Sequence, residues 1–304
     1  MTTTASDAAS SAPHNVIARE VQFDWEQAPL HWLQDDPFAS HAINEFSYLL
    51  MQGEKFFCRV FREALPLVEE GKLRDDVQAF IRQEAIHSRA HHDSIEGYLK
   101  RLGIDGGDFQ RNNELLFDRM LSRKPFGITL PRRLERQWLV MRIGMVAAIE
   151  HFTSALGVYV LDADWERSGA DPVVADLFRW HGAEEIEHRT VAYDLYRYLG
   201  GSWPLRSLLM ALVLPTLTGR MAAGTAELMR QDPTFSARDT RLGRLGFWRL
   251  WQQSDRRGNV PDVAWFIARS LRFFARGYEP LHEADTAQAL AYINNSPAVL
   301  ANRV

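Results

Sequence analysis

Two short motifs in the sequence pair a glutamate with a histidine three residues later. They are Glu84-Ala-Ile-His87 and Glu185-Ile-Glu-His188. In a helix, residues three apart lie on one face about 5 Å from each other, so each motif presents a carboxylate and an imidazole to the same point. These side chains are ligands for metal ions, and two such stripes indicate two metals.

A single glutamate precedes each motif. Glu54 lies within the mostly apolar stretch 49–57, and Glu150 lies within the stretch 146–152. One Glu-x-x-His alone is common on solvated helix faces. A carboxylate in apolar surroundings is costly unless a positive group balances it. The doubled pattern therefore predicts a buried site for two metal ions, held by four carboxylates and two imidazoles.

The elements that must position these side chains are helices. Between residues 44 and 199 glycine and proline are sparse, and apolar residues recur at helical spacing. Helix start and stop signals predict four long helices and a shorter one in the crossover: 44–69, 74–102, 132–160, 172–199 and 113–122. The expected fold is all-α, a ferritin-like four-helix bundle of two antiparallel hairpins joined by a long crossover, with extra C-terminal helices.

The chain is expected to have three parts: a disordered tail over 1–20, the bundle over 21–200, and a C-terminal helical extension over 201–304 that packs on the bundle. The tail matches neither a secretory signal nor a transit peptide. The most apolar stretch, 208–217, contains Pro215 and is shorter than the roughly 20 residues of a spanning helix. We therefore expect no transmembrane segment.

Composition narrows the classes of partner. The formal net charge is -4, with 35 basic and 39 acidic side chains mixed along the chain. No strong field of one sign is left to attract nucleic acid, so we expect no such partner. The lone cysteine, Cys58, excludes an internal disulfide and predicts a reducing, cytoplasmic location.

Over residues 44–199 the doubled motif resembles the ferritin-like di-iron carboxylate superfamily. The resemblance implies two iron ions, with Mn/Fe or zinc as alternatives. It implies two terminal pairs and two bridging carboxylates: Glu54 with His87, Glu150 with His188, and Glu84 and Glu185 between the metals. It also places Glu184 where relatives carry an acidic residue that orients a ligand histidine. A surface charge is the alternative for Glu184, and Glu187 is expected to be solvated.

Two further histidines lie on the same stripes. His181, one turn before Glu185, is similar in position to an extra histidine of the di-iron arylamine N-oxygenases. That similarity implies a seventh ligand, beside the metal served by Glu150 and His188. His91 lies on the same side of the metals but farther away, and it is the weaker candidate. The alternative for each is a buried histidine with a hydrogen-bonded partner.

The whole chain also resembles a bacterial family of predicted metal-dependent hydrolases, through Glu150-His-Phe and Ala183-Glu-Glu-Ile-Glu-His188. Three functions stay open. The ligand set favours an oxygen-activating oxidoreductase (oxygenase, hydroxylase or desaturase), with O2 and a reductase or ferredoxin as partners. The first alternative is a hydrolase that uses a dinuclear metal-bound hydroxide, and the second is a metal-binding protein without catalysis.

The expected substrate is a small apolar or aromatic molecule. Residues near the stripes of the first and third helices would line its pocket: Tyr48, Met51, Phe57, Phe61, Met145 and Ser154. Ser154 resembles a hydroxyl residue near the oxygen site of multicomponent monooxygenases, and it is the one catalytic candidate besides the ligands. An apolar face over 207–217 would suit peripheral contact with a membrane, a long-chain substrate or a second subunit in a homodimer.

Overall fold

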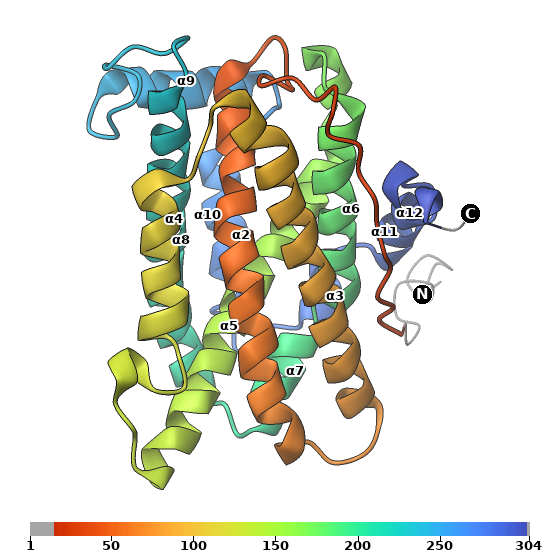
Figure 1. Ribbon diagram of the computed structural model, residues 1–304. Coiled ribbons are helices and arrows are strands. Elements are labelled where there is room, and N and C mark those ends of the chain that lie inside the picture. The colour runs from red at the N-terminus through yellow and green to blue at the C-terminus, as the bar shows by residue number, and fades with distance from the viewer. Residues whose placement is uncertain (1–14, 303–304) are drawn as a thin grey trace, which may run out of the picture.

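The computed structural model describes residues 15–302, and the regular elements in this part of the chain are helices (Figure 1). It contains no strand; one isolated antiparallel bridge joins Leu33 and Ala170. The predicted all-α class is confirmed. Most of the expected N-terminal tail, residues 1–14, lies outside the described residues.

The first helical hairpin consists of α2 (Pro37–Ala64) and α3 (Lys72–Ser94), which pack along each other. α2 begins earlier than the predicted residue 44, because the Asp36 carboxylate accepts a hydrogen bond from the Ala39 amide and Pro37 occupies the first turn. Beyond α3 the chain stays helical through a π-helical turn, Ile95–Leu99, and a 3-10 turn, Lys100–Leu102.

A crossover formed by α4 (Gly107–Glu114) leads to α5 (Arg132–Asp162) and α6 (Pro172–His188), which form the second hairpin. The single helix expected over 172–199 is two helices, because α6 ends and α7 (Val191–Tyr198) begins after a turn. Arg189 lies at this break. Its buried guanidinium donates to the carbonyl of Ile186, within the last turn of α6, and to carbonyls of residues 280–284.

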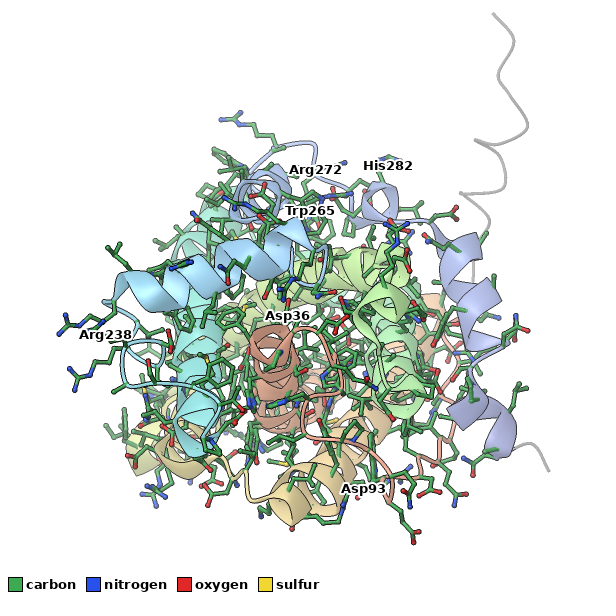
Figure 2. All side chains as sticks on the ribbon, turned by 90° about the horizontal axis from the view of Figure 1, so that it is seen from above. Asp36, Asp93, Arg238, Trp265, Arg272 and His282 are labelled. Carbon is green, nitrogen blue, oxygen red and sulfur yellow. The ribbon has the colours of Figure 1, made fainter. Side chains whose placement is uncertain are left out.

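The C-terminal extension packs on the bundle. Its helices are α8 (Trp203–Gln231), α9 (Leu245–Arg256), α10 (Val263–Arg272), α11 (Thr286–Ile293) and α12 (Pro297–Ala301). α8 lies beside α2 and α5, and α11 lies beside α6. Figure 2 shows α9 crossing the end of the bundle near Asp36, whose carboxylate accepts a hydrogen bond from Ser254 Oγ at 2.8 Å.

Two helices are long and apolar enough to cross a membrane by length and composition alone, α5 and α8. The expectation of a short apolar segment at 208–217 was wrong, because α8 continues through Pro215. In α5, 61% of the most apolar 18-residue segment is buried; in α8, 28% of the corresponding segment is buried. The α5 segment is thus mostly buried in the bundle, whereas most of the α8 segment is not; the cytoplasmic location stays a prediction.

The ordered N-terminal arm begins before residue 21, where the bundle was expected to start. Val16 and Ala18 pack against the core. Arg19 donates two hydrogen bonds to Glu187, at 2.8 and 2.9 Å, and a third to Glu184 at 3.1 Å. Residues 15–20 therefore cover part of α6.

α5 and α6 approach closely at two glycines. A Cβ atom on Gly157 would lie 2.3 Å from the carbonyl oxygen of Gly182, which is backbone and cannot move aside alone. Because Glu150 and Glu185 lie on these same helices, this contact sets the spacing of their carboxylates. Glycine is therefore required at position 157 for packing.

Gly157→Ala is expected to force the two helices apart and to lower stability by about 1–3 kcal/mol, as overpacked cores do. Thermal unfolding measures the change. The matched control is Gly219→Ala in α8, where an added Cβ meets no atom within 4 Å and better helix propensity should leave stability unchanged or slightly raised. Equal effects of the two changes would contradict the close-packing account.

Candidate metal centre

Side chains from four helices meet in the middle of the bundle. Each side chain is almost fully buried, with at most 3% of its surface exposed. The set is Glu54 from α2, Glu84 and His87 from α3, Glu150 from α5, and Glu185 and His188 from α6. The structure thus brings together all six residues that the doubled motif singled out.

Their atoms form two overlapping groups in which potential ligand atoms lie within 4.8 Å of one another. In the first group, His188 Nε2 lies 2.9 Å from Glu150 Oε2, 3.3 Å from Glu84 Oε1 and 3.4 Å from Glu185 Oε2. In the second, Glu54 and Glu84 lie with His87, whose Nδ1 is 3.5 Å from Glu185 Oε1. Glu84 and Glu185 lie between the groups.

The carboxylates lack the partners that buried acids require. Among the described residues, no hydrogen bond of good geometry reaches either oxygen of Glu54, Glu84 or Glu150, or Glu185 Oε2. One nitrogen, His188 Nε2, lies 2.9 to 3.4 Å from three of these carboxylates and cannot satisfy them all. An unsatisfied buried carboxylate is strongly destabilising. A pair of cations at this position would satisfy all of them, and carboxylates with imidazoles suit first-row transition metals. The residues therefore fit the metal pair that the motifs imply.

Without metal, these groups have strongly shifted acidities. Burial raises the pKa of Glu54 and Glu84 well above the usual range, with neighbouring carboxylates adding to the effect at Glu84. Burial and the charge of Glu185 raise the pKa of Glu150 to about 7. Burial alone would raise the pKa of Glu185 as well, but His188 and other histidines outweigh it and lower that pKa well below the usual range.

His181 and His91 extend the cluster. His181 Nε2 lies 2.8 Å from Glu185 Oε1 and 3.4 Å from Glu54 Oε1. The resemblance placed His181 beside Glu150 and His188; instead its ring lies 4.3 Å from that of His87, at the other group. His181 lies at that group because its Nε2 points toward Glu54 of α2.

His91 lies behind His181. Its Nε2 is 2.8 Å from His181 Nδ1, and its Nδ1 is 3.2 Å from Ser47 Oγ. His91 Nε2 is 3.9 Å from the nearest carboxylate oxygen of Glu54. This places His91 as the hydrogen-bonded partner of His181, the alternative role considered for it. Burial lowers the pKa of His181 to about 4 and that of His91 well below its usual value, so both are neutral at pH 7.

Each motif histidine is hydrogen-bonded to a residue on the helix of the other motif. In both cases that residue directly precedes the motif's glutamate. Glu184 Oε2 lies 3.0 Å from His87 Nε2, and Gln83 Oε1 lies 3.0 Å from His188 Nδ1. Glu184 is thus buried against a histidine rather than on the surface. Sequence reasoning missed Gln83, although it directly precedes Glu84 just as Glu184 precedes Glu185.

The prediction that Glu187 is solvated was wrong. Only 7% of its surface is exposed, because Arg19 of the N-terminal arm and Gln83 Nε2 both donate hydrogen bonds to its carboxylate. The arm therefore connects, through Glu184 and Gln83, to both motif histidines.

Gln83→Ala and Glu184→Ala are each expected to weaken metal binding about 10- to 100-fold, as loss of a group that orients a ligand histidine typically does. Each change should weaken one site before the other, because each residue contacts one histidine. Competition with a metal indicator dye measures the affinities. Glu20→Ala is the control, since this exposed glutamate pairs with exposed Arg89. Unchanged affinity in both variants would contradict the orienting role.

The structure does not direct Ser154 toward the carboxylates. Its hydroxyl donates to the carbonyl of His151 in its own helix at 3.2 Å. The residues expected to line a pocket also differ from the observed ones: Tyr48, for example, donates to the carbonyl of Ile104. The difference arises because α5 is rotated relative to our expectation. The side of α5 that lines the observed cavity carries Thr153 and Leu156.

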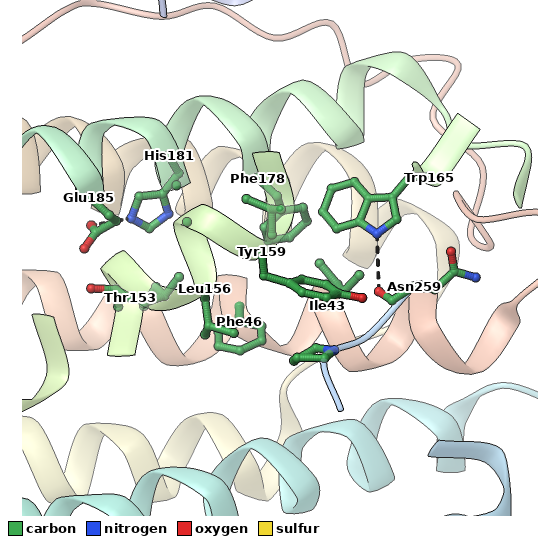
Figure 3. A pocket seen from close by; sticks show the side chains of 15 residues that line it. Ile43, Phe46, Thr153, Leu156, Tyr159, Trp165, Phe178, His181, Glu185 and Asn259 are labelled. Atoms are coloured by element: carbon green, nitrogen blue, oxygen red, sulfur yellow. Dashed lines mark hydrogen bonds and ion pairs between the residues drawn. The ribbon is translucent and has the colours of Figure 1, made fainter. Parts of the chain in front are cut away.

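An apolar cavity adjoins the cluster. It has a volume of about 70 Å³, and His181 and Glu185 line one end (Figure 3). Trp165 and Asn259 lie at the other end, joined by a hydrogen bond from Trp165 Nε1 to the Asn259 carbonyl. Apolar side chains form most of the wall between them: Ile43, Phe46, Leu50, Leu156, Val160 and Phe178.

Fold and site together define a helical-bundle protein with a buried cluster of glutamates and histidines that can hold metal. Residues 17–284 match the family described as predicted metal-dependent hydrolase. The match covers most of the chain, and the protein belongs to this family. No curated protein and no solved structure matches the chain.

The family corrects the first-ranked function. We expected an oxygen-activating oxidoreductase, but the family is described as predicted metal-dependent hydrolases, which was the first alternative. The physical reason for the error is that carboxylates and imidazoles in a bundle define the metals and leave the reaction open. Dioxygen and an electron donor were expected only as co-substrates of oxidation, and hydrolysis requires neither.

Proposed function

We propose that this protein is a hydrolase that uses two metal ions, held by the six clustered glutamates and histidines, to cleave an ester or amide bond. The observation that carries the proposal is the set of buried, unsatisfied carboxylate oxygens between α2, α3, α5 and α6. Membership of a metal-dependent hydrolase family supports it.

Glu54 with His87, and Glu150 with His188, would each hold one metal ion, with Glu84 and Glu185 shared. When bound, the metal pair supplies an activated water and polarises the bond to be cleaved. For the metal we propose iron, with Mn/Fe or zinc as alternatives, because carboxylate and imidazole ligands suit all of them.

Residues of this chain would hold the proton next to Glu185. His181 contacts Glu185 through Nε2 and His91 through Nδ1, and His91 contacts Ser47. Each of these groups can donate in one tautomer and accept in the other. Because Glu185 is ionised, His181 Nε2 carries the proton and donates to it. His181 Nδ1 accepts from His91 Nε2, and His91 Nδ1 accepts from the Ser47 hydroxyl, so no nitrogen in this chain is left unsatisfied.

The apolar cavity indicates the substrate. Its walls between Trp165 and His181 are almost entirely apolar, so the part of the substrate that enters must be apolar too. We propose a small ester or amide with an aliphatic or aromatic acyl group that lies in the cavity, with the scissile carbonyl toward Glu185.

Hydrolysis of nitrophenyl esters of increasing acyl length, measured in an oxygen-free chamber without reductant, tests the proposal. We expect turnover that is unchanged by air and is lost with chelator. Turnover that requires both oxygen and an electron donor, with no hydrolysis of any ester or amide, would overturn it.

A further inference from the structure

The C-terminal end of α2 and the start of α5 lie at the end of the bundle opposite α9 (Figure 1), and side chains there form a second, larger concavity. It has a volume of about 1010 Å³ and is formed by the end of α2, the start of α5 and the end of α7. Five arginines line it: Arg62, Arg123, Arg132, Arg136 and Arg142. The metal centre uses none of them, so this concavity, which we call the arginine pocket, is a separate site.

Most of the positive charge in the arginine pocket is unbalanced. Arg142 donates to both oxygens of Glu63, at 2.7 and 3.2 Å, and Arg123 lies 3.7 Å from Glu135. These are the two acids among the lining residues, against five arginines. Arg62, Arg132 and Arg136 have no carboxylate within ion-pair distance in the described part of the chain.

Two further features make the arginine pocket suitable for an anion. α5 begins at Arg132 without a side-chain cap, so the positive end of its helix dipole adds to the charge of the arginines. Arg142 is buried, with 2% of its surface exposed, and its Nε has no partner. A phosphate group matches this combination, because guanidinium groups bind phosphate oxygens in pairs.

Exposed apolar side chains line the arginine pocket or lie close to its residues in the chain. Phe126 and Ile128, in the loop before α5, are each 61% exposed, and Leu134 is 47% exposed. Leu67 and Tyr198, which line the pocket itself, are 49% and 45% exposed. Phe126 also has a φ of 50°, an unfavourable value for a residue with a side chain. Exposed apolar groups next to basic ones are typical of surfaces that bind anionic membranes.

Two other exposed apolar faces lack this combination. The α8 face over 207–217 exposes Leu208 and Leu212 but contains no charged residue, and a membrane contact there stays a prediction. Near α9, Arg241 and Arg244 are exposed beside Leu245, without an arginine-lined pocket. Charge and shape together therefore select the arginine pocket.

We propose that the arginine pocket binds the phosphate head group of an anionic phospholipid in a bilayer surface, with Phe126, Ile128 and Leu134 entering the interface. A free phosphate compound would use the same arginines but would gain nothing from the apolar rim. The proposal is independent of the reaction at the metal centre.

Flotation of the full chain with phosphatidylcholine vesicles, with and without phosphatidylglycerol, tests the proposal. We expect binding to the anionic vesicles only, weakened by salt. Arg132→Glu with Arg136→Glu should weaken it at least about 30-fold, since each basic residue near an anionic surface contributes roughly fivefold. Phe126→Ala with Ile128→Ala should weaken it about tenfold through lost apolar burial.

Arg241→Glu with Arg244→Glu, at the other end of the bundle, is the matched control and should bind normally. Unchanged helical circular dichroism and metal content would establish that all the variants fold. Three results would each overturn the proposal: equal binding to neutral vesicles, equal loss in the control, or calorimetric binding of inorganic phosphate by a chain that binds no vesicle.

Discussion

Glu185→Ala is expected to remove both metal ions together and to reduce hydrolysis to background. Glu185 lies between the two groups: Oε2 is 3.4 Å from His188 Nε2, and Oε1 is 3.5 Å from His87 Nδ1. Loss of a shared carboxylate removes a ligand from both metals and leaves the other carboxylates close together without compensation. We expect each affinity to fall more than about 100-fold, the upper range for loss of an outer-shell partner.

Elemental analysis of the purified variant measures this effect. The matched control is Glu45→Ala, because Glu45 is a fully buried glutamate of α2 whose two oxygens also lack a hydrogen-bond donor. Burial raises the pKa of Glu45 well above the usual range, yet it lies outside the cluster. The control should keep both metals. A Glu185 variant that retains one metal at normal affinity would show that this carboxylate is not shared.

Chelation is expected to destabilise the protein, and more so at high pH. The pKa of Glu150 is raised to about 7, by burial and the charge of Glu185. Burial opposes the charge of His87, but hydrogen bonds and charges from Glu184 and Glu185 outweigh it and raise the pKa of His87 to about 9. The folded chelated protein therefore binds more protons than the unfolded chain as the pH rises from about 6.5 to about 8.5, and it loses stability over that range.

Metal binding reverses this dependence, because ligands must give up their protons to bind metal and affinity rises with pH. The difference in melting temperature between metal-loaded and chelated protein should therefore be larger at about pH 8.5 than at about pH 6.5, by roughly 4 °C or more for a change of about 2 kcal/mol. Differential scanning calorimetry measures it. A difference that shrinks with rising pH would contradict the proposed ligand set.

The helical class and the meeting of the six motif residues could be predicted because spacing within a helix is local. Glu84 and His87 share a face whatever else the chain does. The break at Arg189 could not be predicted, because it depends on carbonyls of residues 280–284, about ninety positions away. The burial of Glu187 likewise depends on Arg19 of the N-terminal arm.

The function of the site was harder to predict than its position. The same glutamates and histidines can support oxidation or hydrolysis, and the residue types do not separate these reactions. Gln83 could have been found from the internal symmetry of the two motifs, since it stands where Glu184 stands in the second. His181 was placed at the wrong end because sequence spacing fixes its level along α6 and not the direction of its ring.

Titration of the chelated protein with metal, followed by ester hydrolysis in the absence of oxygen, tests the central claim most directly. The account predicts that activity rises with added metal and saturates at two ions per chain. Full activity in the presence of chelator, or no hydrolysis at two ions bound per chain across aliphatic and aromatic esters and amides, would contradict it.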